Sequence, residues 1–76
     1  MNFHERLKLM RKTRKKTQQF MADSLEINIR HYQKYESGEV WPGLDKLVTI
    51  ADLLDCSVDY LLCRDQWVEA HGGIGK

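Results

Sequence analysis

The chain has 76 residues, of which 42% are hydrophobic and 30% are charged, and its formal net charge is +1. This length allows one small domain at most, and the composition favours a folded domain over a disordered chain. The near balance of charges argues against a simple polycation, and the sequence contains no apolar run of the roughly 20 residues that a membrane-spanning helix needs.

The first predicted helix begins after Asn2, which forms a capping box with Glu5 three residues later. Apolar residues at helical spacing predict its buried face, namely Phe3, Leu7 and Met10. The basic run over residues 11–16 closes this helix, because cations are favoured at the negative end of a helix dipole.

The second and third predicted helices span residues 17–24 and 28–36 and are joined by about three residues, which is the spacing of a helix-turn-helix. Thr17 caps the second helix and Asn28 caps the third. The inner face of the second helix is predicted at Met21, Ala22 and Leu25. The third helix buries Tyr32 and Tyr35, which turns its remaining polar side outward.

Two further helices follow a glycine signal at 37–38, where Ser-Gly ends the third helix. Pro42 is suited to the first turn of the fourth helix. The apolar face of that helix is predicted at Leu44, Leu47, Ile50, Ala51 and Leu54. Ser57 caps a fifth helix from Val58 to about Cys63. No strand-like alternation occurs anywhere in the sequence.

Five sequence segments together carry a resemblance to a known family. They are Thr17-Gln18-Gln19-Phe20-Met21-Ala22, Leu25-Glu26-Ile27-Asn28, Tyr32-Gln33-Lys34-Tyr35-Glu36-Ser37-Gly38, Pro42-Gly43-Leu44 and Val58-Asp59-Tyr60-Leu61-Leu62. Over residues 3–62 the chain resembles the phage-repressor/Cro-type helix-turn-helix family. The resemblance implies an all-α fold, a compact five-helix bundle of the lambda-repressor-like kind, over residues 1–63. Residues 64–76 form a C-terminal tail in this interpretation, either disordered or in contact with a second subunit.

The resemblance implies a sequence-specific, DNA-binding transcriptional regulator of phage or mobile-element type. We expect a repressor that binds a palindromic or pseudopalindromic operator as a homodimer, through the major groove of double-stranded DNA. The charge distribution agrees, because residues 1–38 hold nine basic and four acidic side chains, whereas residues 39–76 hold three basic and seven acidic ones. Such asymmetry predicts a basic half that faces DNA and an acidic half that faces away from it.

The outward side of the third helix supplies the predicted base contacts. Arg30 can bind guanine O6 and N7 in bidentate fashion, and Lys34 can reach a guanine or a phosphate. Gln33 can pair with adenine N6 and N7, and Ile29 offers an apolar contact to a thymine methyl group. The alternative interpretation of Arg30 and Lys34 is a solvated charged face.

Predicted phosphate contacts come from the N-terminal turn of the second helix, from the cap of the third helix and from the basic run before the second helix. They are Thr17, Gln18, Asn28, Lys12, Lys15 and Lys16. Thr17 begins a helix whose free N–H groups favour an anion, and the role of Gln18 follows from the resemblance. The alternatives are a solvated first-turn residue for Gln18, a cap for Asn28 and a solvated turn for the lysines.

A structural ion pair between Arg11 and Glu36 is also implied by the resemblance, and the alternative for Arg11 is a phosphate contact. Lys15 and Glu26 stand at positions where glycine is frequent in the family. The position of Glu26 commonly requires a positive φ, which is uncommon for a residue with a Cβ atom.

No catalytic motif or metal-ligand spacing is visible in the sequence, so we expect no enzyme activity, metal, cofactor or small-molecule sensor domain. Cys56 and Cys63 fit reduced thiols, and without a signal peptide or membrane span we expect a cytoplasmic protein. The second hypothesis is a protein-interaction module, similar to an antitoxin or anti-repressor, that keeps the fold with little specific DNA binding. Glu39 and the unusual apolar residues Leu9 and Phe20 motivate this alternative.

Overall fold

The computed structural model describes residues 1–64, so the predicted tail lies outside the described residues except for Arg64. The five helices are α1 (Phe3–Thr13), α2 (Gln18–Ser24), α3 (Ile29–Ser37), α4 (Leu44–Leu53) and α5 (Val58–Leu61). Residues 1–64 contain no strand, and the predicted all-α class is therefore confirmed.

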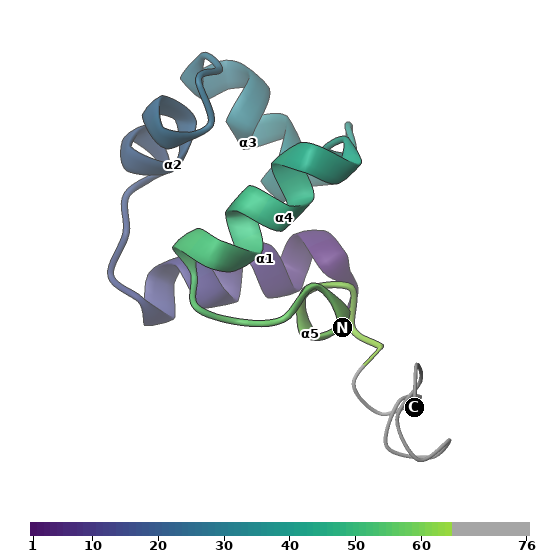
Figure 1. The fold of residues 1–76 in the computed structure, drawn as a ribbon. Coiled ribbons are helices and arrows are strands. Elements are labelled where there is room, and N and C mark those ends of the chain that lie inside the picture. Colours follow the sequence, from purple (N-terminus) through teal and green to yellow (C-terminus); the bar gives the residue numbers. More distant parts are fainter. Residues whose placement is uncertain (65–76) are drawn as a thin grey trace.

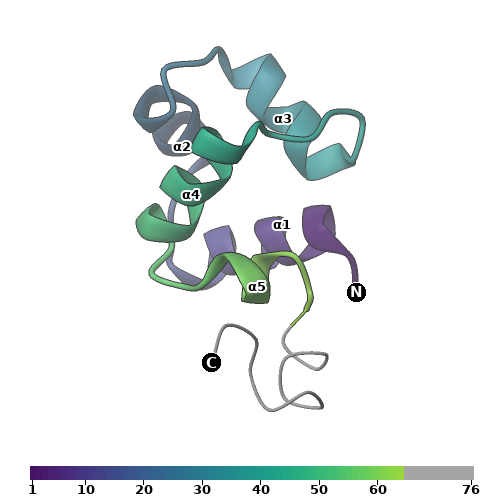
Figure 2. The same ribbon diagram turned by 45° about the vertical axis from the view of Figure 1, so that its right-hand side comes forward.

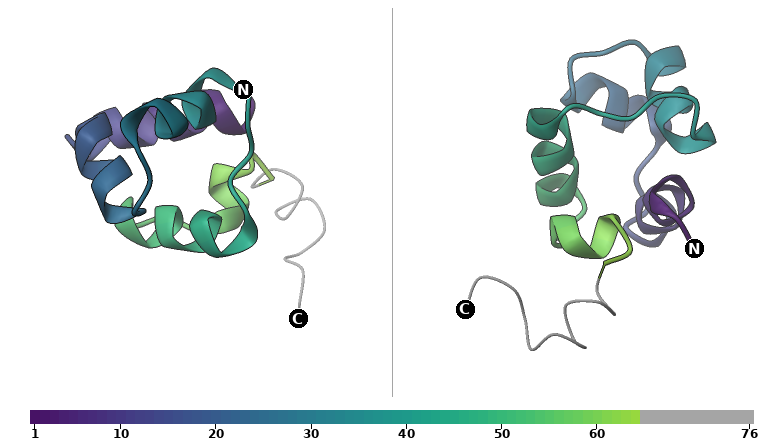
Figure 3. Two further views of the ribbon diagram at one scale, coloured as in Figure 1. Left: turned by 90° about the horizontal axis from the view of Figure 1, so that it is seen from above. Right: turned by 90° about the vertical axis from the view of Figure 1, so that its right-hand side faces the viewer.

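The helices surround one common core (Figure 1). α2 packs against α3, α1 packs against both α3 and α5, and α4 packs against α5. Figure 2 shows α5 beside α1 at the bottom of the molecule, and Figure 3 shows α4 on the side of the core opposite α1. The buried core residues come from all five helices and the turns that follow them: Phe3, Leu7, Met10, Met21, Ala22, Leu25, Tyr32, Tyr35, Leu47, Ile50, Ala51, Leu54 and Leu61.

Side-chain caps fix where four of the helices begin. Asn2 and Glu5 form the predicted capping box at α1, with both N···O distances at 3.1 Å. Thr17, Asn28 and Ser57 each accept a hydrogen bond from the backbone N–H three residues later, at 2.9, 2.7 and 3.0 Å. Each cap provides an acceptor for an N–H group that has no partner inside its helix, so the predicted helix starts at these residues are confirmed.

Three predictions about helix limits are wrong. α1 ends at Thr13, so the basic run extends past its end, and α5 ends at Leu61 instead of Cys63. α4 begins at Leu44, so Pro42 precedes the helix and Gly43 is its N-cap. Leu44 is 75% exposed and lies outside the core. Side chains in a helix lean toward its N-terminus, so a first-turn residue such as Leu44 projects beyond the layer that covers the rest of its face.

Left-handed residues end the helices. Positive φ angles occur at Lys15, Glu26, Gly38, Asp55 and Cys63, of which Gly38 alone among these five is a glycine. At Glu26, with φ 58°, the N–H donates to the carbonyl of Asp23, and the next N–H donates to the carbonyl of Ala22. This pairing provides donors for the last carbonyls of α2. Glu26 thus adopts the positive φ that its position commonly requires, and the turn keeps its shape without glycine.

Substituting Glu26→Gly is expected to raise the free energy of unfolding by about 0.5–1 kcal/mol. The left-handed conformation costs a residue with a Cβ about 1–2 kcal/mol, and the greater freedom of glycine in the unfolded chain offsets about 0.5–1 kcal/mol of that gain. Urea denaturation followed by circular dichroism measures the change. Glu26→Ala is the matched control, because it removes the carboxylate and keeps the strain. Equal effects of the two substitutions would show that the charge, and not the φ angle, decides the stability.

Candidate nucleic-acid interface

The solvent-facing side of α3 carries a row of polar side chains. Arg30, Gln33 and Lys34 are all exposed, and together with Ser37 and Glu39 they border a shallow hollow in the surface. The predicted base-contacting polar residues therefore share one open face. At the end of this face the Ser37 hydroxyl donates a hydrogen bond to the Glu39 carboxylate at 3.3 Å.

The residues at the start of α3 are less accessible to DNA than the sequence predicts, because several of them make contacts within the domain. Ile29 is only partly exposed and packs against the core, so only part of its side chain is available to a thymine methyl group. The Asn28 side chain accepts the hydrogen bond from the His31 N–H and is thereby committed as a cap. The His31 ring meets the Tyr35 ring edge-to-face, with 5.0 Å between centroids. Arg30 is consequently the most accessible side chain in the first turn.

A buried ionic network fixes α3 to the rest of the domain. The Arg11 Nε lies 2.6 Å from Glu36 Oε2, and Arg11 Nη2 lies 3.3 Å from Oε1. Tyr32 donates its hydroxyl to Glu36 Oε2 at 2.5 Å, and Gln18 donates its amide N–H to Oε1 at 3.1 Å. The guanidinium also donates to the carbonyl of Lys16 at 2.9 Å. Residues from α1, α2 and α3 thus meet at one carboxylate, and the arginine lies in the fold instead of on a phosphate.

The pKa shifts in this network follow from its geometry. Burial alone raises the pKa of Glu36, but the hydrogen bonds from Arg11, Tyr32 and Gln18 outweigh burial and lower the pKa below its ordinary value. The pKa of Arg11 is raised, because its hydrogen bond to Glu36 outweighs its own burial. The pKa of Tyr32 is raised by burial and by its hydrogen bond to the carboxylate. At neutral pH the network is therefore a carboxylate, a guanidinium and a neutral phenol.

The depressed pKa of Glu36 predicts a loss of stability in acid. Because the folded pKa lies below the unfolded one, the contribution of Glu36 to the free energy of unfolding is complete above the ordinary value of 4.5. It is lost as the pH falls through the folded pKa. Thermal unfolding between about pH 7 and pH 3 measures this loss. Glu36→Gln cannot titrate, so its stability is expected to fall less over this range and to approach that of the parent in acid. Parallel curves for the two proteins would assign the acid loss to other groups.

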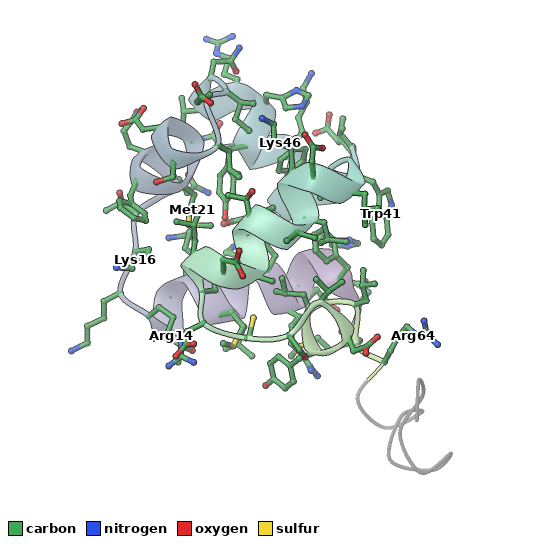
Figure 4. All side chains as sticks on the ribbon, in the orientation of Figure 1. Arg14, Lys16, Met21, Trp41, Lys46 and Arg64 are labelled. Carbon is green, nitrogen blue, oxygen red and sulfur yellow. The ribbon has the colours of Figure 1, made fainter. Side chains whose placement is uncertain are left out.

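Of the residues predicted to contact phosphates, all except Asn28 lie around the connection from α1 to α2. Lys12 and Lys15 are exposed, and the Lys16 ammonium lies 4.9 Å from the centre of the Phe20 ring. Figure 4 shows Lys16 at the outer edge of the molecule, beside the chain that leads into α2. The hydroxyl of Thr17 is engaged as the α2 cap, and Gln18 belongs to the buried network. Within this predicted group, the side chains of Lys12 and Lys15 are thus the most available for a phosphate contact.

Two arginines have structural roles that the sequence analysis missed. Arg14 donates from Nε to the carbonyl of Leu54 at 2.8 Å and from Nη2 to the carbonyl of Asp55 at 3.2 Å. It thereby neutralises the negative end of α4. Arg6 donates to the carbonyl of Tyr60 at 3.1 Å, and its guanidinium lies 4.1 Å from the centre of the Tyr60 ring. Both contacts join α1 to segments about 40 to 54 residues away, which no local pattern reveals.

The structure also places four other side chains, those of Cys56, Trp41, Leu9 and Phe20. Cys56 is partly buried against the core, and burial raises the pKa of its thiol. Trp41 stacks on Phe3 with 4.8 Å between ring centroids, although it remains 61% exposed. Leu9 and Phe20 are 45% and 40% exposed. Among residues 1–64 there is no group of His, Cys, Asp or Glu able to hold a metal ion, and none of the helices in this range is long and apolar enough to cross a membrane.

Comparison of the sequence with known proteins finds a match to the helix-turn-helix family over residues 7–61. The cryptic phage CTXphi transcriptional repressor RstR of Vibrio cholerae is 48% identical over 64 residues, which are 84% of this chain and 57% of the relative. The uncharacterized HTH-type transcriptional regulator YqaE of Bacillus subtilis is 48% identical over 60 residues, 79% of this chain and 52% of the relative. The chain spans just over half the length of these two relatives.

Comparison of the fold finds two similar solved structures. One is the P22 c2 repressor in complex with synthetic operator 9T, with a TM-score of 0.77 and 26% identity over 84% of this chain and 97% of that one. The other is a transcriptional regulator from Listeria innocua, with a TM-score of 0.74 and 25% identity over 92% of this chain and 75% of that one. Both likenesses agree with the predicted lambda-repressor-like bundle.

Proposed function

This chain belongs to the helix-turn-helix family, and on that premise we propose that it is a sequence-specific, DNA-binding transcriptional regulator. Its α3 enters the major groove, and residues 1–63 form the DNA-binding domain. The observation that carries the proposal is the open polar face of α3, whose helix is fixed to α1 and α2 through Glu36. A rigid support of this kind suits base recognition, because a contact to a base edge depends on a fixed approach. Helix-turn-helix regulators are not an enzyme class.

Base recognition is assigned to the solvent-facing residues of α3. Arg30 contacts a guanine, Lys34 contacts a guanine or a phosphate, and Gln33 contacts an adenine. Ile29 contributes the exposed part of its side chain to a thymine methyl group. This assignment is supported by the exposure of the three polar residues on one face.

Contacts to the DNA backbone are assigned to the N-terminal end of α2, to the N-cap of α3 and to the lysines that precede α2. The proposed residues are Thr17, Gln18, Asn28, Lys12, Lys15 and Lys16. The backbone N–H groups of the first turn of α2 favour a phosphate. The side-chain oxygens of Thr17 and Asn28 accept the capping hydrogen bonds. These two residues therefore contact phosphate by donating a backbone N–H, the Thr17 hydroxyl hydrogen or an N–H of the Asn28 side-chain amide.

We also propose that two copies bind a palindromic operator as a repressor in the cytoplasm. RstR is a phage repressor and shares 48% identity with this chain, which supports a repressor of the same general kind. Symmetric half-sites would place two copies of α3 about 34–36 Å apart. The second copy is expected on the acidic side of the domain, where four exposed aspartates lie on α4, on α5 and in the turn between them: Asp45, Asp52, Asp55 and Asp59.

Selection of bound sites from a random DNA pool tests the proposal directly. We expect enrichment of a symmetric sequence, followed by fluorescence anisotropy that shows tight and salt-dependent binding. Six phosphate contacts predict a loss of about 10³-fold in affinity between 50 and 200 mM salt. A random output pool together with a flat salt response would favour the protein-interaction module instead.

A further inference from the structure

One lysine of the basic run before α2 has its backbone fixed from both sides. The Lys16 N–H donates a hydrogen bond to the carbonyl of Arg11 at 3.0 Å, and the Lys16 carbonyl accepts one from the Arg11 guanidinium at 2.9 Å. Arg11 is itself held by the buried carboxylate of Glu36. The point from which the Lys16 side chain extends is therefore fixed relative to α1 and α3.

An exposed aromatic ring also holds the far end of this side chain. The Lys16 ammonium lies 4.9 Å from the centre of the Phe20 ring, within the roughly 6 Å over which the face of a ring attracts a cation. Phe20 lies in the first turn of α2 and is 40% exposed, so burial in the core does not explain a phenyl ring at this place. Lys12 and Lys15 are more exposed than Lys16, and among residues 1–64 no ring or carboxylate holds their ammonium groups.

A lysine held in this way is prepared for an anion. An ammonium has several N–H donors, so a cation over a ring can still donate to a phosphate oxygen. A side chain that is already held loses less conformational freedom on binding than a mobile one does. We propose that Phe20 is a positioning residue that holds the Lys16 ammonium for a phosphate of the DNA backbone. This inference rests on the proposed function and deepens it, because Lys16 then contributes more to affinity than the more exposed Lys12 and Lys15.

Fluorescence anisotropy on the selected operator and on a random-sequence duplex tests the role of the ring. Phe20→Leu is expected to weaken binding by about 2- to 5-fold, the range of an exposed cation–π contact. The factor should be the same on both DNAs, because a phosphate contact carries no sequence information. Phe20→Tyr keeps an aromatic ring and is expected to bind like the parent. An equal loss for Phe20→Tyr would overturn the inference.

Double variants show whether Phe20 acts through Lys16. In a Lys16→Gln background, Phe20→Leu should change the affinity no further, whereas in a Lys12→Gln background it should weaken binding by the same factor as in the parent. Lys16→Gln alone should weaken binding more than Lys12→Gln or Lys15→Gln. It should also reduce the slope of log affinity against log salt by about 0.9, because one phosphate contact is lost. An unchanged slope would overturn the inference.

A spectroscopic measurement and two further variants control the experiment. Nuclear magnetic resonance detects the contact itself, as an upfield ring-current shift of the Lys16 Hε protons that Phe20→Leu abolishes. Leu9→Ala removes an apolar side chain of α1 that is 45% exposed, and we expect its DNA affinity to equal that of the parent. Phe20→Met also lacks a ring and serves if Phe20→Leu unfolds, as thermal melting will show.

The remaining outcomes are equally distinct. The inference is overturned if the ring-current shift is absent, if Phe20→Leu weakens binding equally in the Lys16→Gln background, or if Phe20→Leu strengthens binding. If the unaltered chain binds neither DNA, the proposed function falls together with this inference. A chain that binds DNA and is indifferent to Phe20→Leu overturns the inference alone.

Discussion

Substituting Glu36→Ala is expected to destabilise the domain by about 3–5 kcal/mol, because removing one partner strands a buried charge. The Arg11 guanidinium and the Tyr32 hydroxyl would both lose the carboxylate that they share. A domain of this size has only about 3–5 kcal/mol from its core, so the variant is expected to be largely unfolded at 25 °C. Urea denaturation followed by circular dichroism, compared with the parent, measures the loss.

Two controls show whether the loss comes from the stranded charge. Glu39→Ala removes an exposed carboxylate near the end of the same helix and is expected to change stability by less than about 0.5 kcal/mol. The triple variant Arg11→Met, Tyr32→Phe, Glu36→Leu replaces the polar groups by apolar ones of similar size. It should recover much of the stability, because apolar replacement of a whole buried network is often neutral. If the triple variant is no more stable than Glu36→Ala, packing and not charge explains the effect.

Local signals in the sequence are sufficient for most of the fold. The helix starts at Asn2, Thr17, Asn28 and Ser57 were predictable because a capping side chain acts within three residues of its own position. The buried faces were predictable because helical spacing repeats every three to four residues. Leu44 follows the same spacing and yet is exposed. Periodicity identifies a face of a helix but does not show how far along the helix its neighbours reach.

The site depends on contacts that no local pattern contains. Arg14 and Lys15 are adjacent members of one basic run, yet Arg14 binds carbonyls at the end of α4 while Lys15 is exposed. Likewise, Gln18 and Gln33 meet across 15 residues of sequence because the buried carboxylate of Glu36 lies between their helices. Net charge by halves therefore overstates the cations available to DNA. Arg6, Arg11 and Arg14 bind groups within the fold. The other basic side chains of that half are Lys8 on α1, the lysines near α2 and the two cations on the outer face of α3.

Removing both cations from the α3 face is expected to have the largest effect on DNA binding. Arg30→Ala with Lys34→Ala should weaken binding to the selected operator by about 100-fold or more, since each good base contact contributes about 1–3 kcal/mol. Binding to random DNA should weaken far less, because base contacts carry sequence discrimination while phosphate contacts do not. Anisotropy titrations on both DNAs at one salt concentration measure the two losses. Lys8→Ala with Lys46→Ala removes the same charge from α1 and α4 and should leave the ratio of the two affinities unchanged. Equal losses on both DNAs for the α3 variant would place Arg30 and Lys34 on phosphates, and no loss on either would make them a solvated charged face.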